Sequence, residues 1–204
     1  TINESSSTTY DGAISGTGGI VTVTGGNTLT LSGASSYTGA TNLSSGTITL
    51  NNNAAKLGSG AGAINMATGT TLGSTATAVS LINPVAITGT GTFDATTSNA
   101  LTLSGIVSGD AFTKTSAGTV TLSNANTYTG VTTVSAGTLA LTGSGAIASS
   151  ASVAVTGTLD ISGVTTGATV NQLSGSGGVV IGGKTLTINE SSSTTYDGAI
   201  SGTG

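Results

Sequence analysis

Short stretches in which every second residue is apolar recur along the chain and predict β-strands. In "TLTL" (28–31) and "TITL" (47–50) leucine and isoleucine alternate with threonine, so one side of each strand carries aliphatic groups and the other carries hydroxyls. Glycine-containing clusters such as "SGTGG", "YTG" and "SGSGG" separate these stretches, as expected of turns. No segment keeps a 3.6-residue period. The pattern therefore predicts an all-β protein of many short strands.

The same alternation predicts which side chains fill the core and which form the corners. The core-facing strand positions are Leu29, Leu31, Ile48, Leu50, Val120, Leu122, Leu139 and Leu141. The tyrosines and turn glycines expected at corners are Tyr10, Gly12, Tyr37, Gly39, Gly46, Tyr128, Gly130, Gly137, Tyr196 and Gly198. We expect each tyrosine ring to pack over a glycine turn with its hydroxyl at the surface. A platform for stacking sugars is the alternative interpretation.

Repetition operates at two levels. The segment "TINESSSTTYDGAISGTG" occurs twice, letter for letter, with its copies starting at positions 1 and 187. We interpret 1–186 as one tandem unit and 187–204 as the start of the next identical unit. Inside the unit, 28–50 aligns without gaps on 119–141, 91 residues later (119 − 28), which divides it into half-units of approximately 91 and 95 residues.

Such nested repeats favour a β-solenoid over a sandwich or a barrel. Each unit leaves strand edges without hydrogen-bond partners, and a further coil of the same kind covers them. We therefore expect one continuous solenoid without separate globular domains. At roughly 20 residues per coil and about 4.8 Å between strands, a unit corresponds to on the order of nine coils and about 45 Å.

Three segments carry a family resemblance: "YDGAISGTGGIVTV" (10–23), "NTLTLSGASSYTGATNLSSGTITL" (27–50) and "GTVTLSNANTYTGVTTVSAGTLAL" (118–141). They closely resemble the autotransporter-associated beta-strand repeat, which occurs in passenger regions of bacterial autotransporters and in very large surface adhesins. The resemblance implies a right-handed parallel β-helix that is secreted by a Gram-negative bacterium and is extracellular or held at the cell surface. Passenger repeats are usually more degenerate than this long tandem unit, which favours a giant adhesin or a matrix fibre.

Composition excludes several classes of partner. Of 204 residues only 5% are charged, the net charge is −4, and the cations are three lysines, so little is available to neutralise a nucleic-acid backbone or an anionic membrane surface. No apolar run approaches the roughly 20 residues that span a bilayer. Cysteine is absent, which leaves packing and main-chain hydrogen bonds to hold the fold. We expect neither nucleic-acid binding nor membrane insertion by this segment.

The same inventory offers little for catalysis or metal binding. Histidine is absent, which excludes catalysis by a Ser–His pair. Lys56, Lys114 and Lys184 occupy turn-like settings where we expect exposed, solubilising side chains. The acids are Glu4, Asp11, Asp94, Asp110, Asp160, Glu190 and Asp197. They form neither an adjacent carboxylate pair nor a calcium-loop pattern, and we interpret them as turn and edge residues. We predict no catalytic residue, no metal site and no cofactor.

Three functions remain open. The first is a structural and adhesive repeat that forms a stiff stalk, an extracellular fibre or biofilm matrix, with neighbouring copies of the same repeat as its partners. The second is a Thr-faced binding module for polysaccharide or ice, in which the Thr-x-Thr pattern lapses across 51–91. The third is a polysaccharide-degrading β-helix enzyme, for which catalytic groups are lacking.

Overall fold

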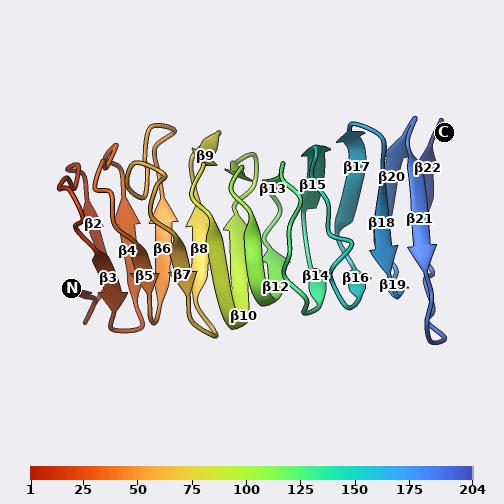
Figure 1. Ribbon diagram of the computed structural model, residues 1–204, viewed down its shortest axis with the longest axis horizontal. Helices are drawn as coiled ribbons and strands as arrows, with labels where there is room; N and C mark the ends of the chain where they lie inside the picture. The colour runs from red at the N-terminus through yellow and green to blue at the C-terminus, as the bar shows by residue number, and fades with distance from the viewer. Residues whose placement is uncertain (204) are drawn as a thin grey trace.

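The chain forms a long stack of flat coils, with its two ends at opposite ends of the stack (Figure 1). The computed structural model describes residues 1–203, which contain 22 β-strands and no helix. The strands are β1 (Ile2–Asn3), β2 (Thr8–Tyr10), β3 (Val21–Thr24), β4 (Thr28–Leu31), β5 (Thr41–Leu43), β6 (Thr47–Leu50), β7 (Ile64–Met66), β8 (Thr71–Ser74), β9 (Val79–Leu81), β10 (Val85–Ala95), β11 (Ala100–Leu103), β12 (Val107–Thr115), β13 (Thr119–Leu122), β14 (Thr132–Val134), β15 (Thr138–Gly143), β16 (Val153–Val155), β17 (Thr158–Val164), β18 (Gly167–Asn171), β19 (Leu173–Gly175), β20 (Gly178–Gly182), β21 (Thr185–Asn189) and β22 (Ile200–Gly202).

Strands of successive coils pair in parallel, and the coils differ in length. Gly167 pairs with Thr185 across a short coil, whereas Thr47 pairs with Thr71 across a longer one. The architecture is a β-solenoid of about 10 turns, which confirms the predicted all-β fold of stacked parallel strands. Most of the variation in coil length lies in the loops, and register shifts occur within three pairings, those of β10 with β12, β15 with β17 and β20 with β22.

Each coil has three sides, and the sides of successive coils build three faces. β7, β8 and β9 are the sides of one coil. We call the face with β1, β3, β5 and β7 the first face, that with β2, β4, β6 and β8 the second face, and the seven-stranded sheet β9, β11, β13, β15, β17, β20 and β22 the third face. The second face continues through β14, β16 and β19.

The long strands β10 and β12 join the first face to the second. The start of β10 pairs with β7 and its end pairs with β8, and its register against β12 shifts between Ile87 and Thr90. Gly89, at this corner, has a φ of +74°, a conformation that glycine adopts without the strain imposed by a Cβ atom. Both faces therefore belong to one sheet of 13 strands that is folded along its length.

The first face can be followed from Ile2 to Ile188 in nine steps. One residue per coil marks the path: Ile2, Val23, Leu43, Met66, Ile87, Gly109, Thr129, Ala151, Val170 and Ile188. The first five steps and the last are strand pairings. The amides of Thr129 and Ala151 each donate to the preceding coil, and the side chain of Asn171 links the next coil to the carbonyl of Ser150. Since Ile188 is the sequence counterpart of Ile2, one complete unit returns the chain to the same face.

The two half-units, in contrast, are rotated by one side of the coil. Thr28 begins β4 on the second face, whereas its counterpart Thr119 begins β13 on the third face. Four coils lead along the second face from Thr28 to Thr113, and Thr119 begins the next side of that coil. Equivalent sequence motifs therefore face different directions.

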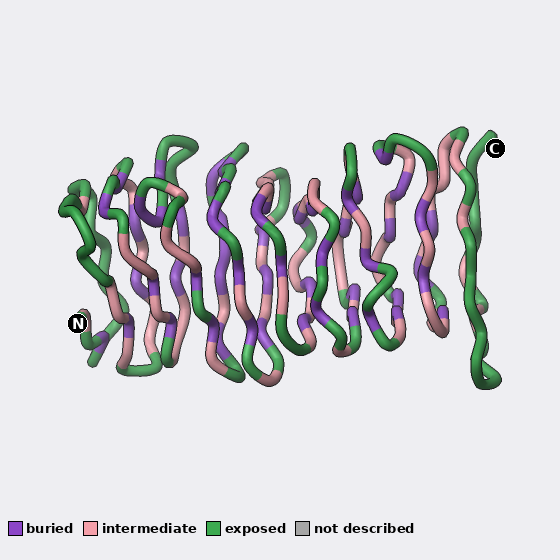
Figure 2. Tube along the Cα trace, in the orientation of Figure 1, coloured by how far each residue is buried: buried purple, intermediate pink, exposed green. Residues whose placement is uncertain are grey.

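The core is a narrow column of mostly aliphatic buried residues, and buried positions recur from coil to coil along the stack (Figure 2). The eight strand positions expected in the core are each at most 3% exposed. Near the middle, three aromatic rings pack together: the centroid of Phe112 lies 5.0 Å from that of Phe93 and 5.1 Å from that of Tyr128. Pro84, which has no amide to donate, directly precedes β10.

Candidate functional site

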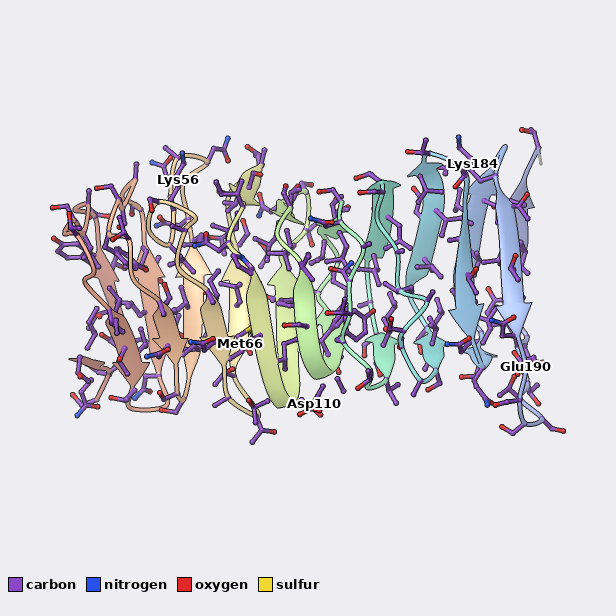
Figure 3. All side chains as sticks on the ribbon, in the orientation of Figure 1. Lys56, Met66, Asp110, Lys184 and Glu190 are labelled. Atoms are coloured by element: carbon purple, nitrogen blue, oxygen red, sulfur yellow. The ribbon has the colours of Figure 1, made fainter. Side chains whose placement is uncertain are left out.

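Charged side chains are spread over the corners of the solenoid rather than gathered in one place. Lys56 and Lys184 lie along one edge, and Asp110 and Glu190 along the opposite edge (Figure 3). Within residues 1–203, no three acidic side chains come close enough together to hold a metal ion. The carboxylates of Asp94 and Asp110 accept hydrogen bonds from Thr115 and from the amide of Gly89 in adjacent coils. These acids connect neighbouring coils at corners.

Glu4 departs from the expected exposed position. Its side chain is 4% exposed, and Oε2 accepts a hydrogen bond of 2.6 Å from the hydroxyl of Thr8. Its carbonyl also accepts a hydrogen bond from the side chain of Asn27 in the next coil. The interpretation of every acid as a surface turn residue is therefore wrong for Glu4, because the coil folds over this side chain.

Lys114 is the clearest correction to the sequence analysis, since it was expected to be exposed and is fully buried. Its Nζ donates to the carbonyls of Thr115, Ser116 and Ala136, the last of these in the next coil. Burial lowers the pKa of Lys114, and the negative charge of Asp94 partly opposes that shift. The ammonium group holds two successive corners together.

The position of Lys114 follows from the same alternation that places the aliphatic residues. In "FTKT" (112–115) Phe112 and Lys114 are both inward, and the threonines point outward. The counterpart of Lys114 in the first half-unit is Val23 (114 − 91), which is also buried. Period-two alternation would have predicted an inward Lys114, but the nearby turn and the charge favoured a surface position.

Two tyrosines form buried pairs with threonine. The hydroxyls of Tyr37 and Thr41 form one hydrogen bond, and those of Tyr128 and Thr132 form the other, at 2.7 Å. Burial raises the pKa of both tyrosines. Tyr37 and Tyr128 therefore carry their hydroxyls inside, and the expected surface position is wrong for them. A sugar-stacking platform is also ruled out at these two positions, because no ring face is open.

The tyrosines of the repeated segment lie differently. Tyr10 is 46% exposed and its ring covers Gly12, where an added Cβ would meet the ring atoms. Tyr196 covers Gly198 in the same way and donates a hydrogen bond of 2.6 Å to the carbonyl of Gly177. For this pair the ring does pack over its own glycine turn.

The remaining corner glycines permit close stacking of coils. Gly46 and Gly137 are counterparts with φ of +80° and +61°. A Cβ on either would collide with a carbonyl oxygen of the preceding coil, that of Asn27 or Gly118. Gly39 and Gly130 likewise leave no room for a Cβ against the coil before them. The sequence identified these as turn positions, and the structure adds that the neighbouring coil needs the space.

A column of threonines runs along the outside of the second face. Its members, one per coil over six successive coils, are Thr28, Thr47, Thr71, Thr92, Thr113 and Thr133. Each lies beside an inward core residue, and all six are half-buried. We call this set the threonine column.

The prediction that the Thr-x-Thr pattern lapses across 51–91 is correct for only one of its two threonine positions. Thr71 continues the column inside that range. The second position of the Thr-x-Thr pattern does lapse, because the register places Gly73 and Asp94 between Thr49 and Thr115. One row of hydroxyls is therefore continuous and the adjacent row is interrupted.

One surface hollow lies beside Lys56. It has a volume of about 400 Å³ and is bordered by Ser36, Asn53, Ser59 and Ile82. Ile82 is 63% exposed, and the other side chains are small and polar. The hollow contains no acid and no second cation, so it offers no groups for acid–base chemistry.

Comparison with known families matches two parts of this architecture. The model of the passenger-associated-transport-repeat matches residues 21–50 and 112–141, which begin at counterpart positions in the two half-units. That repeat belongs to autotransporter passenger domains, and the match confirms the resemblance seen in the sequence. No curated protein and no solved structure matches the chain. The described residues contain no helix that is long and apolar enough to cross a membrane.

Replacing Lys114 by alanine should lower the free energy of unfolding by about 2–5 kcal/mol, since it leaves a cavity and three carbonyls without their donor. Lys56→Ala is the matched control: that side chain is exposed, and its loss should change stability by no more than about 0.5 kcal/mol. Urea titrations followed by circular dichroism measure both. Equal small effects would contradict the buried position of Lys114.

Alkaline pH should destabilise the fold through the buried tyrosines. Because their pKa is raised on folding, the unfolded chain ionises first, at about pH 10, and unfolding becomes more favourable as pH rises above this value. The double variant Tyr37→Phe with Tyr128→Phe should lose less stability between pH 9 and 11 (roughly the range spanned by tyrosine ionisation), although it is less stable at neutral pH. Tyr10→Phe, at an exposed ring, should leave the alkaline loss unchanged, and an equal effect of both variants would refute this assignment.

Proposed function

We propose that this chain is a structural and adhesive repeat of a secreted bacterial surface protein, in which it forms part of a stiff stalk or extracellular fibre. The observation that carries the proposal is the unbroken strand pairing along the second face, from Thr8 in β2 to Gly175 in β19. Bending such a stack would require breaking main-chain hydrogen bonds on one side. Stiffness along the axis is therefore a direct consequence of the pairing.

Location and partners follow from the matched repeat. Passenger repeats of autotransporters belong to secreted or cell-surface proteins of Gram-negative bacteria, and this setting suits a chain without cysteine. The partners we propose are neighbouring copies of the same unit and glycans of the cell surface or matrix. The scattered acids and the buried Lys114 support a structural role over an enzymatic one.

Stalks of increasing length test the proposal. Cells displaying one, two or four consecutive units beneath a fluorescent tip should show tip heights that increase linearly, by about 43 Å per unit for nine coils at about 4.8 Å. A flexible chain would extend only with the square root of its length. Tip heights that increase with the square root of length would refute the stalk. Retention on glycan-coated surfaces no better than that of cells displaying a Gly/Ser linker would refute the adhesive part.

The threonine column favours a second candidate function, a binding surface for polysaccharide or ice. Six hydroxyls in register, spaced by about 4.8 Å on a flat parallel sheet, present a regular row to a periodic ligand. The half-burial of these side chains also restricts their rotation, which reduces the entropic cost of binding.

Removing hydroxyls from the column tests this candidate. Thr71→Val, Thr92→Val and Thr113→Val together keep the branched shape and should abolish any signal in a glycan array or an ice-recrystallisation assay. Thr102→Val with Thr121→Val, on the third face, is the matched control and should leave the signal intact. No response from the unmodified chain in either assay would eliminate the binding surface.

A further inference from the structure

The segment that occurs twice in the sequence is seen in two different environments. Residues 1–18 contact the coil that follows them: Ile2 pairs with Val23, and Thr9 pairs with Thr30. Residues 187–203 show the opposite side of the segment, because they contact the coil that precedes them. There Ile188 pairs with Val170. The two copies together display every neighbour that the segment would have inside a longer solenoid.

The two copies share an internal contact that shows a common conformation. The hydroxyl of Thr8 lies 2.6 Å from Oε2 of Glu4, and the hydroxyl of Thr194 lies 2.7 Å from Oε2 of Glu190. These threonines and glutamates are the same positions of the repeated segment. This Thr–Glu contact therefore forms whether the neighbouring coil follows or precedes the segment.

The contacts on the two sides use different atoms. Toward the preceding coil, Oε1 of Glu190 accepts the amide of Leu173. Toward the following coil, the carbonyl of Glu4 accepts the side chain of Asn27 and its amide donates to Thr24. One copy of this glutamate can make all three contacts at once, since no donor or acceptor is used twice.

Apolar side chains of the second copy remain open on the side away from the preceding coil. Ile188 is 38% exposed and Ile200 is 48% exposed, and both border a hollow of about 500 Å³ with Ile181 and Leu186. In the first copy, the counterpart side is covered by the coil that contains Val23 and Leu29. The occupant that fits the exposed side is therefore a coil of the same sequence as residues 19–41.

We propose that residues 187–203 belong to a junction coil on which a second copy of the tandem unit continues the solenoid without a break. The second copy stacks in the register of Ile2 on Val23 and Thr9 on Thr30. Because one unit completes nine coils and returns to the first face, successive units present the same faces on the same sides. This proposal rests on the proposed structural function and adds the register and the orientation of the units.

The number of coils per unit determines which side of the fibre carries the threonine column in each copy. A unit that closed after a fractional number of coils would place the column on a different face in each copy, as happens between the half-units at Thr28 and Thr119. With nine coils the column recurs on one side of the fibre, with a period of about 43 Å.

Paired spin labels in a protein of two consecutive units, residues 1–186 followed by 1–204, test the junction. The sequence lacks cysteine, so each introduced pair is the only one labelled. Cysteines at Thr169 of the first unit and at Thr22 of the second unit lie on the two strands that flank the junction strand, because Thr169 pairs with Thr187 and Ile2 pairs with Val23. They should lie about 10 Å apart, twice the spacing between strands, and show clear spin–spin broadening. Thr47→Cys with Thr92→Cys, two coils apart in the single chain, is the positive control. Thr169→Cys in the first unit with Thr121→Cys in the second unit, on another face, is the negative control.

Broadening at the junction equal to that of the positive control supports the proposal. Its absence, with the positive control intact, overturns it. The stalk measurement separates the two proposals. If the labels are uncoupled but tip heights still increase linearly, the stalk is supported and the proposed stacking register of the units is refuted. Coupled labels with heights that do not increase linearly support the junction and refute the stalk.

Discussion

Main-chain hydrogen bonding between successive coils is the constraint on which the rest of this structure depends. Each strand has both edges satisfied only when a coil lies before and after it, so the fold exists only as a stack. Coils about 4.8 Å apart leave little height for side chains, and some corners have no room for a Cβ atom, as at Gly46 and Gly137. The high glycine content and the small aliphatic core follow from this spacing.

Polar side chains inside the corners donate hydrogen bonds to main-chain carbonyls that have no partner in a strand. A corner turns the main chain out of strand geometry, and its carbonyls then need donors from elsewhere. Lys114 supplies one set, and the side chain of Asn83 supplies another by donating to the carbonyls of Leu57 and Gly62. Across residues 1–203 no buried side-chain nitrogen or oxygen lacks a partner. Such satisfied networks keep each coil in register with the next.

The relation between sequence period and coil number determines how the surface repeats. The offset between the half-units moves a motif from the second face to the third, whereas a complete unit returns Ile188 to the face of Ile2. The same strand motif can therefore serve two faces within a unit, while complete units keep one orientation. The two matches to the passenger-associated-transport-repeat are accordingly equivalent in sequence but rotated in space.

The sequence by itself determined the strands, the inward side of "TLTL" and "TITL", the turn positions and the nested repeats, because alternation and identity are local properties that need no knowledge of neighbours. Only the tertiary structure decided that the hydroxyls of Tyr37 and Tyr128 lie inside and that carbonyls of two coils surround the ammonium group of Lys114, since a corner's interior is formed by two coils together. It also decided that Thr71 completes the threonine column. Because the coils differ in length, register across them depends on hydrogen bonding between strands far apart in the chain.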